Sequence, residues 1–147
     1  MTDYLKEIDR GLIIEEPEVI IPWNLEKRDI FDMIKSINIT NENYYTFKIV
    51  LSGIPFVNCA GLHFEKEILS KINLFNDEGY PESEITDVFN NHQLVLENLF
   101  GKSVKCLLAK LKGFDKEYKW KFRYVTIIHR LWDRFGMEEN FQIFINK

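Results

Sequence analysis

One long amphipathic helix restricts what this chain can fold into. Across residues 81–100 the side chains of a single helix face recur at the i, i+3, i+4, i+7 spacing. They are Ile85, Val88, Phe89, His92, Val95, Leu96 and Leu99. Pro81 suits the first helical position, and Gly101 suits the residue just after the last turn. A helix with one apolar stripe must bury that stripe against another element, so the sequence predicts a helix over 81–100 lying on a sheet.

Segments on both sides of this helix have the alternating apolar pattern of strands. They cover residues 44–51, 60–68, 69–75, 104–111, 118–131 and 141–145, with an uncertain phase over 64–72. Strands that follow one another without intervening helices favour an antiparallel sheet. We therefore predict an α+β fold in a single globular domain, 1–147. It has a mainly antiparallel sheet of about six strands, the long helix 81–100 packed on it, and one or two shorter N-terminal helices. Those helices are expected at 3–10, before Gly11, and at 25–37, with Asn24 as the N-cap.

Aromatic and cationic residues alternate strictly over residues 118–124. The rings are Tyr118, Trp120, Phe122 and Tyr124, and the cations are Lys119, Lys121 and Arg123. Such a mixture suits a surface on which nucleic-acid bases stack, but a stacking groove needs rings and cations on one face. Because alternate residues of a strand point to opposite faces, we expect the rings to cover the long helix and the cations to face water.

The alternation changes phase after this stretch. After Tyr124 the residues expected to point inward fall at odd instead of even positions, at Val125, Ile127, His129 and Leu131. This change predicts either a bulge near residues 123–125 or a strand buried on both faces.

The charge of the chain is divided unevenly. The net charge is -4, but residues 1–100 hold eight Lys or Arg and eighteen Asp or Glu, whereas residues 101–147 hold eleven and five. An acidic surface raises the rate at which a basic partner associates. The basic excess of the last third leaves nucleic-acid binding by this C-terminal part as an alternative, although the acidity of the whole chain opposes it.

Two pairs of residues are candidates for chemistry. His63 and Glu65 lie two apart on a strand and share a face, where they could bind a metal or exchange a proton. His129 and Asp133 share a parity if their strand continues that far. These four residues are the catalytic candidates. The chain has no HExxH, CxxC, GxSxG or phosphate-binding glycine motif, so we predict neither a cofactor nor a metal.

Other polar residues invite a structural interpretation. His92 lies on the apolar helix face, which favours a hydrogen-bonded core histidine over a ligand. Glu138 and Glu139 follow "DRFG", where paired carboxylates suit acid–base work but more often form a solvated turn, here with Arg134 as their ion-pair partner. Cys59 and Cys106 are predicted to be buried free thiols.

The compartment is predicted from what the chain lacks. The first residues have no apolar segment of signal-peptide length, and no apolar run approaches the ~20 residues of a membrane span. We therefore expect a cytoplasmic protein with no membrane partner. No sequence feature indicates an oligomeric state.

A set of short motifs resembles a group of small bacterial proteins. The motifs are "IIPW", a helix running to "LFG", "YKWKF", "IIH", "DRFG" and "EENFQIFI". The group comprises single-domain immunity-type and uncharacterised α+β proteins from toxin–immunity gene neighbourhoods. The resemblance implies a non-enzymatic inhibitor that binds and masks a cognate toxin, so it transfers no catalytic residue.

The leading expectation is therefore a protein-binding module, an immunity protein with a basic, toxin-like protein partner. The alternatives are a small enzyme or ligand-binding protein with a pocket near His63 and Glu65 or near His129 and Asp133, and nucleic-acid binding by the basic C-terminal part.

Overall fold

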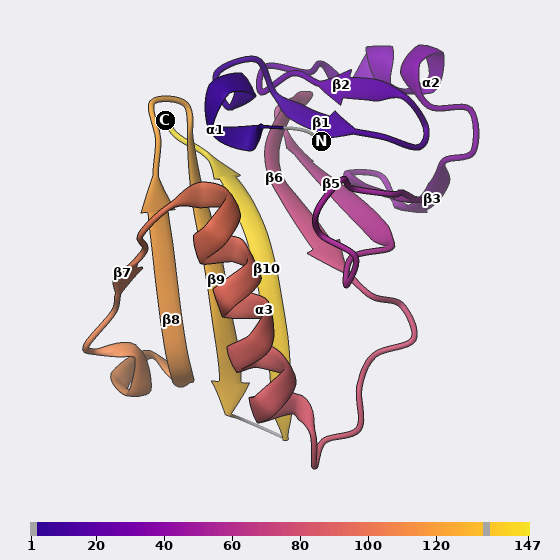
Figure 1. Cartoon of the computed structure of the whole chain (residues 1–147). Helices are drawn as coiled ribbons and strands as arrows, with labels where there is room; N and C mark the ends of the chain where they lie inside the picture. Colours follow the sequence, from indigo (N-terminus) through magenta and orange to yellow (C-terminus); the bar gives the residue numbers. More distant parts are fainter. Residues whose placement is uncertain (1–2, 134–135) are drawn as a thin grey trace.

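A computed structural model describes residues 3–133 and 136–147. Its larger sheet is antiparallel, has eight strands in the order β3-β4-β5-β6-β10-β9-β8-β7, and carries the long helix α3 on one face (Figure 1). These elements are β3 (Asn38–Asn41), β4 (Tyr44–Lys48), β5 (Cys59–Glu65), β6 (Ile68–Phe75), α3 (Ile85–Phe100), β7 (Val104–Lys105), β8 (Phe114–Lys121), β9 (Val125–Asp133) and β10 (Met137–Ile145). The predicted α+β class and antiparallel sheet are confirmed, but the predicted number of about six strands is wrong.

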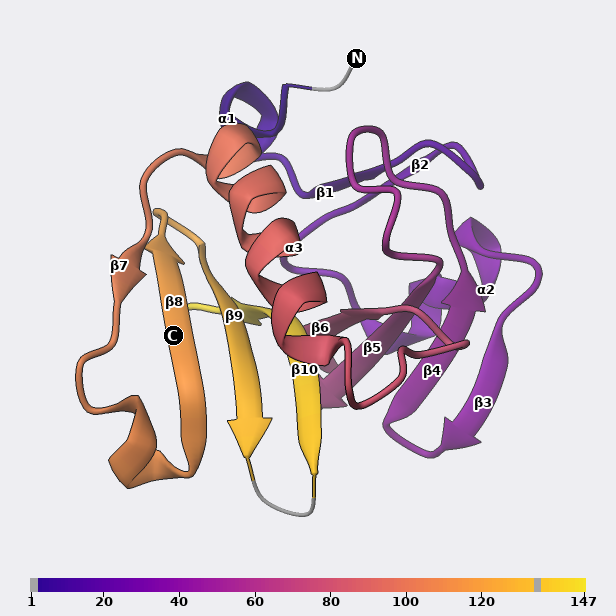
Figure 2. The same ribbon diagram turned by 60° about the horizontal axis from the view of Figure 1, so that its bottom comes forward.

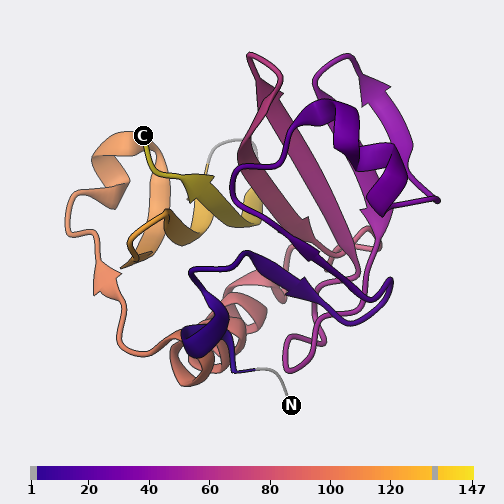
Figure 3. The same ribbon diagram turned by 90° about the horizontal axis from the view of Figure 1, so that it is seen from above.

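A smaller sheet is formed by the N-terminal segment. β1 (Leu12–Ile14) pairs with β2 (Val19–Ile21), and helix α1 (Tyr4–Glu7) precedes them. Figure 3 shows α1 beside the end of α3, where the rings of Tyr4 and Phe100 lie 5.6 Å apart. This contact ties the N-terminal segment to the helix, and Leu12, Ile14 and Ile21 complete the shared core.

The predicted helix over 25–37 is wrong in extent. The chain forms only a 3-10 turn, η1 (Lys27–Asp29), and one helical turn, α2 (Ile30–Met33). Asn24 is not the cap, since Glu26 occupies the N-cap position of the 3-10 turn. The helix ends before Ile34, whose backbone is already extended with φ -129° and ψ 113°, and both Ile30 and Ile34 are buried.

The long helix begins later than its pattern suggests. Residues 81–84 form a turn and α3 starts at Ile85, whereas its end before Gly101, with a φ of +87°, is as predicted. Two residues of this helix, Phe89 and Leu96, are completely buried. The indole N–H of Trp120 donates to the carbonyl of Gly101 at 2.8 Å and ties the helix end to β8.

The predicted strand over 118–131 is two strands. β8 ends at Lys121, β9 begins at Val125, and the Phe122 N–H donates to the Val125 carbonyl at 2.9 Å across a tight turn. The change of phase is therefore a chain reversal and not a bulge. The sequence hides this turn because none of its residues is Gly, Pro, Asn or Asp.

The predicted burial of the rings is confirmed where they meet α3. Trp120 is 3% exposed, and its ring lies 6.0 Å from that of Phe100, while Tyr118 lies 6.1 Å from Phe89 and is half-buried. Phe122 is also half-buried, but Tyr124 lies in the turn and is 41% exposed. The ring face of β8 is thus committed to the core.

Three further segments differ from the sequence pattern or clarify it. Residues 38–41 form β3 although their sequence lacks the alternation of a strand. The phase that the sequence leaves uncertain over 64–72 is set by a register shift between His63 and Phe64, next to a turn in which Lys66 and Glu67 have positive φ. The predicted strand 104–111 is wrong beyond Lys105, because the chain there turns outward through the 3-10 turn η2 (Ala109–Lys112).

Among residues 3–133 and 136–147, no helix combines the length and the apolar character that a membrane span requires.

Candidate functional site

A pocket opens where β6 and β10 diverge. Residues 71–74 of β6 pair with residues 141–144 of β10, and the pairing of these two strands ends there. Residues 137–140 of β10 pair with β9 on one side and extend past β6 on the other (Figure 2). The cavity has a volume of about 460 Å³. Its lining residues are Tyr44, Phe56, Val57, Asn73, Leu74, Phe75, Asn76, Gly79, Tyr80, Ile85, Met137, Glu138, Glu139, Asn140, Phe141 and Gln142.

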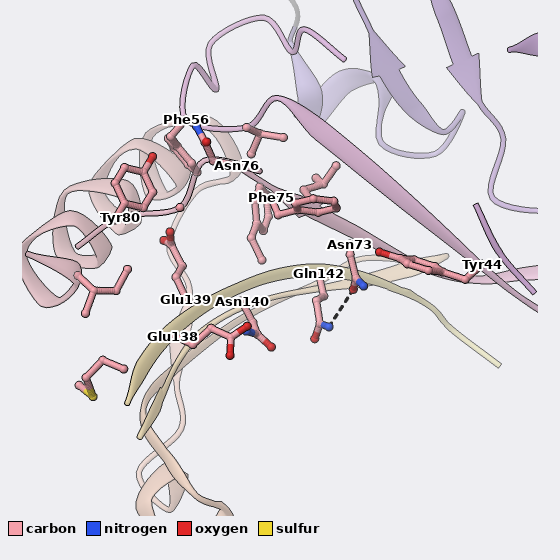
Figure 4. A pocket seen from close by; sticks show the side chains of 16 residues that line it. Tyr44, Phe56, Asn73, Phe75, Asn76, Tyr80, Glu138, Glu139, Asn140 and Gln142 are labelled. Atoms are coloured by element: carbon pink, nitrogen blue, oxygen red, sulfur yellow. Dashed lines mark hydrogen bonds between the residues drawn. The ribbon is translucent and has the colours of Figure 1, made fainter. Parts of the chain in front are cut away.

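Amide side chains are locked in place along one part of the pocket. Gln142 donates to Asn73 at 2.9 Å (Figure 4). Asn73 in turn contacts the Nε2 atom of His63 at 2.9 Å. The Oδ1 atom of Asn140 accepts from the indole N–H of Trp132 at 2.5 Å. These bonds cross β5, β6, β10 and β9, so this wall is rigid before any ligand arrives.

A buried carboxylate between two histidines borders the pocket on the helix side. The Nε2 atom of His129 lies 2.5 Å from Oε2 of Glu139, and Nδ1 of His92 lies 2.9 Å from the same oxygen. His129 is completely buried and His92 is 9% exposed. The rings of Phe56 and His92 stack with centroids 3.7 Å apart, and those of Phe89 and His129 with centroids 4.0 Å apart. Aromatic packing therefore fixes both imidazoles against the carboxylate.

The hydrogen bonds around His129 define where its protons lie. The amide nitrogen of Gln93 donates to Glu97 at 2.9 Å and to Ser103 at 3.1 Å, which directs its amide oxygen toward Nδ1 of His129 at 2.8 Å. An amide oxygen accepts, so Nδ1 carries a proton. The other ring nitrogen faces Glu139, so His129 and Glu139 together hold one further proton, which makes them an imidazolium–carboxylate pair or its neutral equivalent.

Electrostatics keep Glu139 ionised. Burial raises the pKa of its carboxyl, but the hydrogen bonds and charges of His129 and His92 outweigh this and lower the pKa to about 2. Burial, together with the nearby His92, lowers the pKa of His129 below its ordinary value, although the hydrogen bond and negative charge of Glu139 act in the opposite direction. The cluster is thus a structural ion pair at the edge of the pocket.

The predicted residues His63 and Glu65 both line a second cavity, between β5, β6 and the end of β10, but no hydrogen bond joins the two. His63 stacks on Tyr44 with ring centroids 4.1 Å apart and contacts Asn73, whereas Glu65 is exposed at the end of β5. Burial and the charge of Lys71 lower the pKa of His63 to about 4. His63 therefore contacts the amide wall of the first pocket through Asn73 while it lines the second cavity.

The predicted pair His129 and Asp133 is also not formed. β9 does continue to Asp133, but four residues along a strand span roughly 13 Å. The partner of His129 is Glu139, which lies on the neighbouring strand and not in a solvated turn. Arg134, its predicted ion-pair partner, lies outside the described residues. The interpretation of His92 as a hydrogen-bonded core histidine is confirmed.

Sequence reasoning missed the role of Glu139, although a signal was present. Glu139 has the parity of Phe141 and Ile143, whose side chains enter the core. In the described part of the chain, no group of three or more His, Cys, Asp or Glu is arranged to hold a metal ion.

A second feature is an exposed apolar segment at the edge of the sheet, which we call the leucine–lysine surface. It consists of Val104, Leu107, Leu108 and Leu111, framed by Lys102, Lys105 and Lys110. The exposed fractions of the four apolar side chains are 72%, 89%, 61% and 83% in that order.

The chain turns these leucines outward because other residues take the inner positions. β7 pairs with β8, and the Cys106 N–H donates to the Glu117 carbonyl at 2.8 Å. Ala109 is the buried anchor of η2, and Gly113 ends it with a φ of +90°. Cys106, predicted to be buried, is only half-buried, whereas Cys59 is buried as predicted.

Comparison with known proteins gives no relative: no protein family, no curated protein and no solved structure matches this chain.

Proposed function

We propose that the protein is a non-enzymatic protein-binding module whose partner docks on the leucine–lysine surface. The observation that carries this proposal is the exposure of Leu107, Leu108 and Leu111 within five consecutive residues. Burying one leucine side chain is worth about 1.5–3 kcal/mol, so three of them supply a large driving force for association. Large apolar side chains that are exposed together in one segment are typical of interaction sites.

The surrounding charges specify the chemistry of the partner. Lys102, Lys105 and Lys110 are exposed and form no salt bridge within residues 3–133 and 136–147. A partner that covers the leucines therefore gains by placing carboxylates around an apolar centre. The immunity role that the sequence resemblance implies is one form of such binding, in which the partner is a toxin.

The expectation of a basic partner concerns a different part of the chain. It rests on the acidity of residues 1–100, and the leucine–lysine surface does not test it. His129, one of the four enzymatic candidates, is completely buried and pairs with Glu139, which favours a structural role over contact with a substrate.

Capture from the source cells with matched variants tests the proposal. The double variant Leu107→Ser/Leu111→Ser removes two side chains of the surface, and Leu94→Ser, which alters a leucine of α3 that is 69% exposed, is the control. We expect the unaltered chain and the control to recover the same protein in a 1:1 ratio, and the double variant to lose it.

Two results would contradict the proposal. One is equal recovery by the double variant and the control, and the other is no recovered protein when neighbouring genes are co-expressed. Release of the captured material by nuclease would instead favour the nucleic-acid alternative. Equal thermal unfolding of all three chains shows that the variants fold, because substitutions at exposed sites change stability by about 0.5 kcal/mol or less.

A further inference from the structure

We infer that the pocket between β6 and β10 is a second binding site, and that it accepts the guanidinium group of an arginine side chain. This site lies apart from the leucine–lysine surface, which belongs to β7 and η2 at the far edge of the sheet (Figure 1). The inference therefore does not depend on the proposed function.

The charge of the pocket selects a cation. Of the described residues that line it, Glu138 and Glu139 are carboxylates and none is a lysine, arginine or histidine. The loop and helix start beside it, residues 76–90, contain five Asp or Glu and no Lys or Arg, and one of these acids, Asp77, is paired with Lys48. The cation next to the lining is Arg130, which donates to Gln142 at 2.8 Å and is offset by the buried carboxylate of Glu117 at 3.2 Å. Low-dielectric walls around charges of one sign concentrate the field, so the pocket attracts positive groups.

Glu138 is the carboxylate that remains available. Glu139 is committed to His92 and His129, whereas Glu138 is exposed and has no salt bridge to any residue in 3–133 or 136–147. Figure 4 shows Glu138 and Asn140 on one side of β10 and Glu139 on the other, directed toward Tyr80. A cation that enters from solvent therefore meets Glu138 first.

The remaining lining favours arginine over a simple ammonium ion. Phe75 brings an aromatic ring to the pocket, and a guanidinium group stacks on such a ring while it donates in its own plane. The methylene stem of an arginine packs against apolar lining such as Leu74. The volume of about 460 Å³ lies within the range of small-ligand sites and exceeds what one side chain fills, which leaves room for flanking peptide.

Tyr44, which also lines the pocket, is held in place by a glycine. A Cβ atom added to Gly61 would lie 2.6 Å from Cε2 of Tyr44, so the ring lies flat over the backbone of β5. The hydroxyl group of Tyr44 forms no hydrogen bond with any described residue, so it can accept from a guanidinium group in the pocket.

A pair of isosteric peptides tests the inference directly. The probes are acetyl-Gly-Arg-Gly-amide and acetyl-Gly-citrulline-Gly-amide, which differ in charge but hardly in shape. We expect the arginine peptide to shift the backbone amide signals of Gly79, Glu138 and Asn140 saturably, with a Kd on the order of 1 mM, and the citrulline peptide to bind at least about fivefold more weakly.

Matched variants locate the charge. Glu138→Gln is expected to weaken the arginine peptide about fivefold, whereas Glu84→Gln, an exposed acid of the same neighbourhood outside the lining, leaves it unchanged. Equal binding of both peptides, shifts confined to residues away from the pocket, or no shift up to about 20 mM peptide would each overturn the inference. None of these outcomes bears on capture of a partner by the leucine–lysine surface.

Discussion

Replacing Glu139 by glutamine tests the ion pair beside the pocket. Glutamine keeps the shape of the side chain but removes the charge that His92 and His129 share. The pKa of Glu139 is lowered from 4.5 to about 2, and such a difference corresponds to about 3 kcal/mol of stabilisation by the ionised form. With a side chain only 13% exposed, Glu139 is screened little by solvent.

The sign of the pH dependence follows from the direction of this change. Because the pKa is lower in the folded chain than in the unfolded chain, the contribution of Glu139 is fully present above pH 4.5 and is lost as the pH falls to about 2. We therefore expect Glu139→Gln to reduce the free energy of unfolding by about 3 kcal/mol at pH 7, and the two chains to converge as the pH falls.

Urea unfolding at a series of pH values measures this difference. Glu138→Gln, the exposed neighbour, is the control and should change stability by no more than about 0.5 kcal/mol at any pH. A loss for Glu139→Gln that stays the same from pH 7 to pH 3 would refute the reasoning, because it would show a packing defect and not a lost charge.

Two further substitutions and one titration test the fold. Leu96→Ala should cost about 2–5 kcal/mol in urea unfolding because Leu96 is fully buried, whereas Leu94→Ala on the exposed face of α3 should cost about 0.5 kcal/mol or less. Gly61→Ala should destabilise the chain by about 1–3 kcal/mol, and the same change in a Tyr44→Ala background should cost much less, since the added Cβ meets the Tyr44 ring; equal costs in both backgrounds would contradict this. The imidazole of His63 should titrate by NMR with a midpoint near 4, so its contribution to stability is present above the ordinary pKa of 6.5 and is lost as the pH falls from 6.5 to 4; a midpoint near 6.5 would contradict its burial against Tyr44.

The parts of the fold that follow from local periodicity could be predicted from the sequence. The stripe from Ile85 to Leu99 identifies α3 and its need for a sheet, because each residue type agrees with the helical period and with the cap at Gly101. The start was placed four residues early because Pro81 and its neighbours fit a helix, yet residues 81–84 are exposed and have no core contact to hold one.

The hairpin between β8 and β9 could not be placed from local signals. Its turn consists of Phe122, Arg123 and Tyr124, none of which favours the turn conformation, so the ring alternation runs on through the reversal. Only the change of parity at Val125 marked it. Such turns are imposed by the pairing of the strands on either side, which is a property of the whole sheet.

The site depends on register, and register is not written in any one segment. In the antiparallel pairing of β10 with β9, Phe141 lies opposite His129. Glu139 lies two residues before Phe141 on the same face of β10, so its side chain is a diagonal neighbour of His129. The partner on α3, His92, lies forty-seven residues from Glu139 in the chain. The alternation of Glu139 with Phe141 and Ile143 indicated an inward side chain, but its partners were beyond reach of a sequence pattern.

The pocket and the buried ion pair have one structural origin. Where β6 accompanies β10, the inner side chains of β10 are Phe141 and Ile143 and the core is closed. Where β6 departs, the next inner side chain is Glu139, which meets His129 of β9 at 2.5 Å and His92 of α3 at 2.9 Å. A buried charge without such partners would cost several kcal/mol, so the divergence of the strands and the placement of the histidines are coupled. Any change that closes the gap between β6 and β10 should therefore disturb the ion pair and the arginine site together.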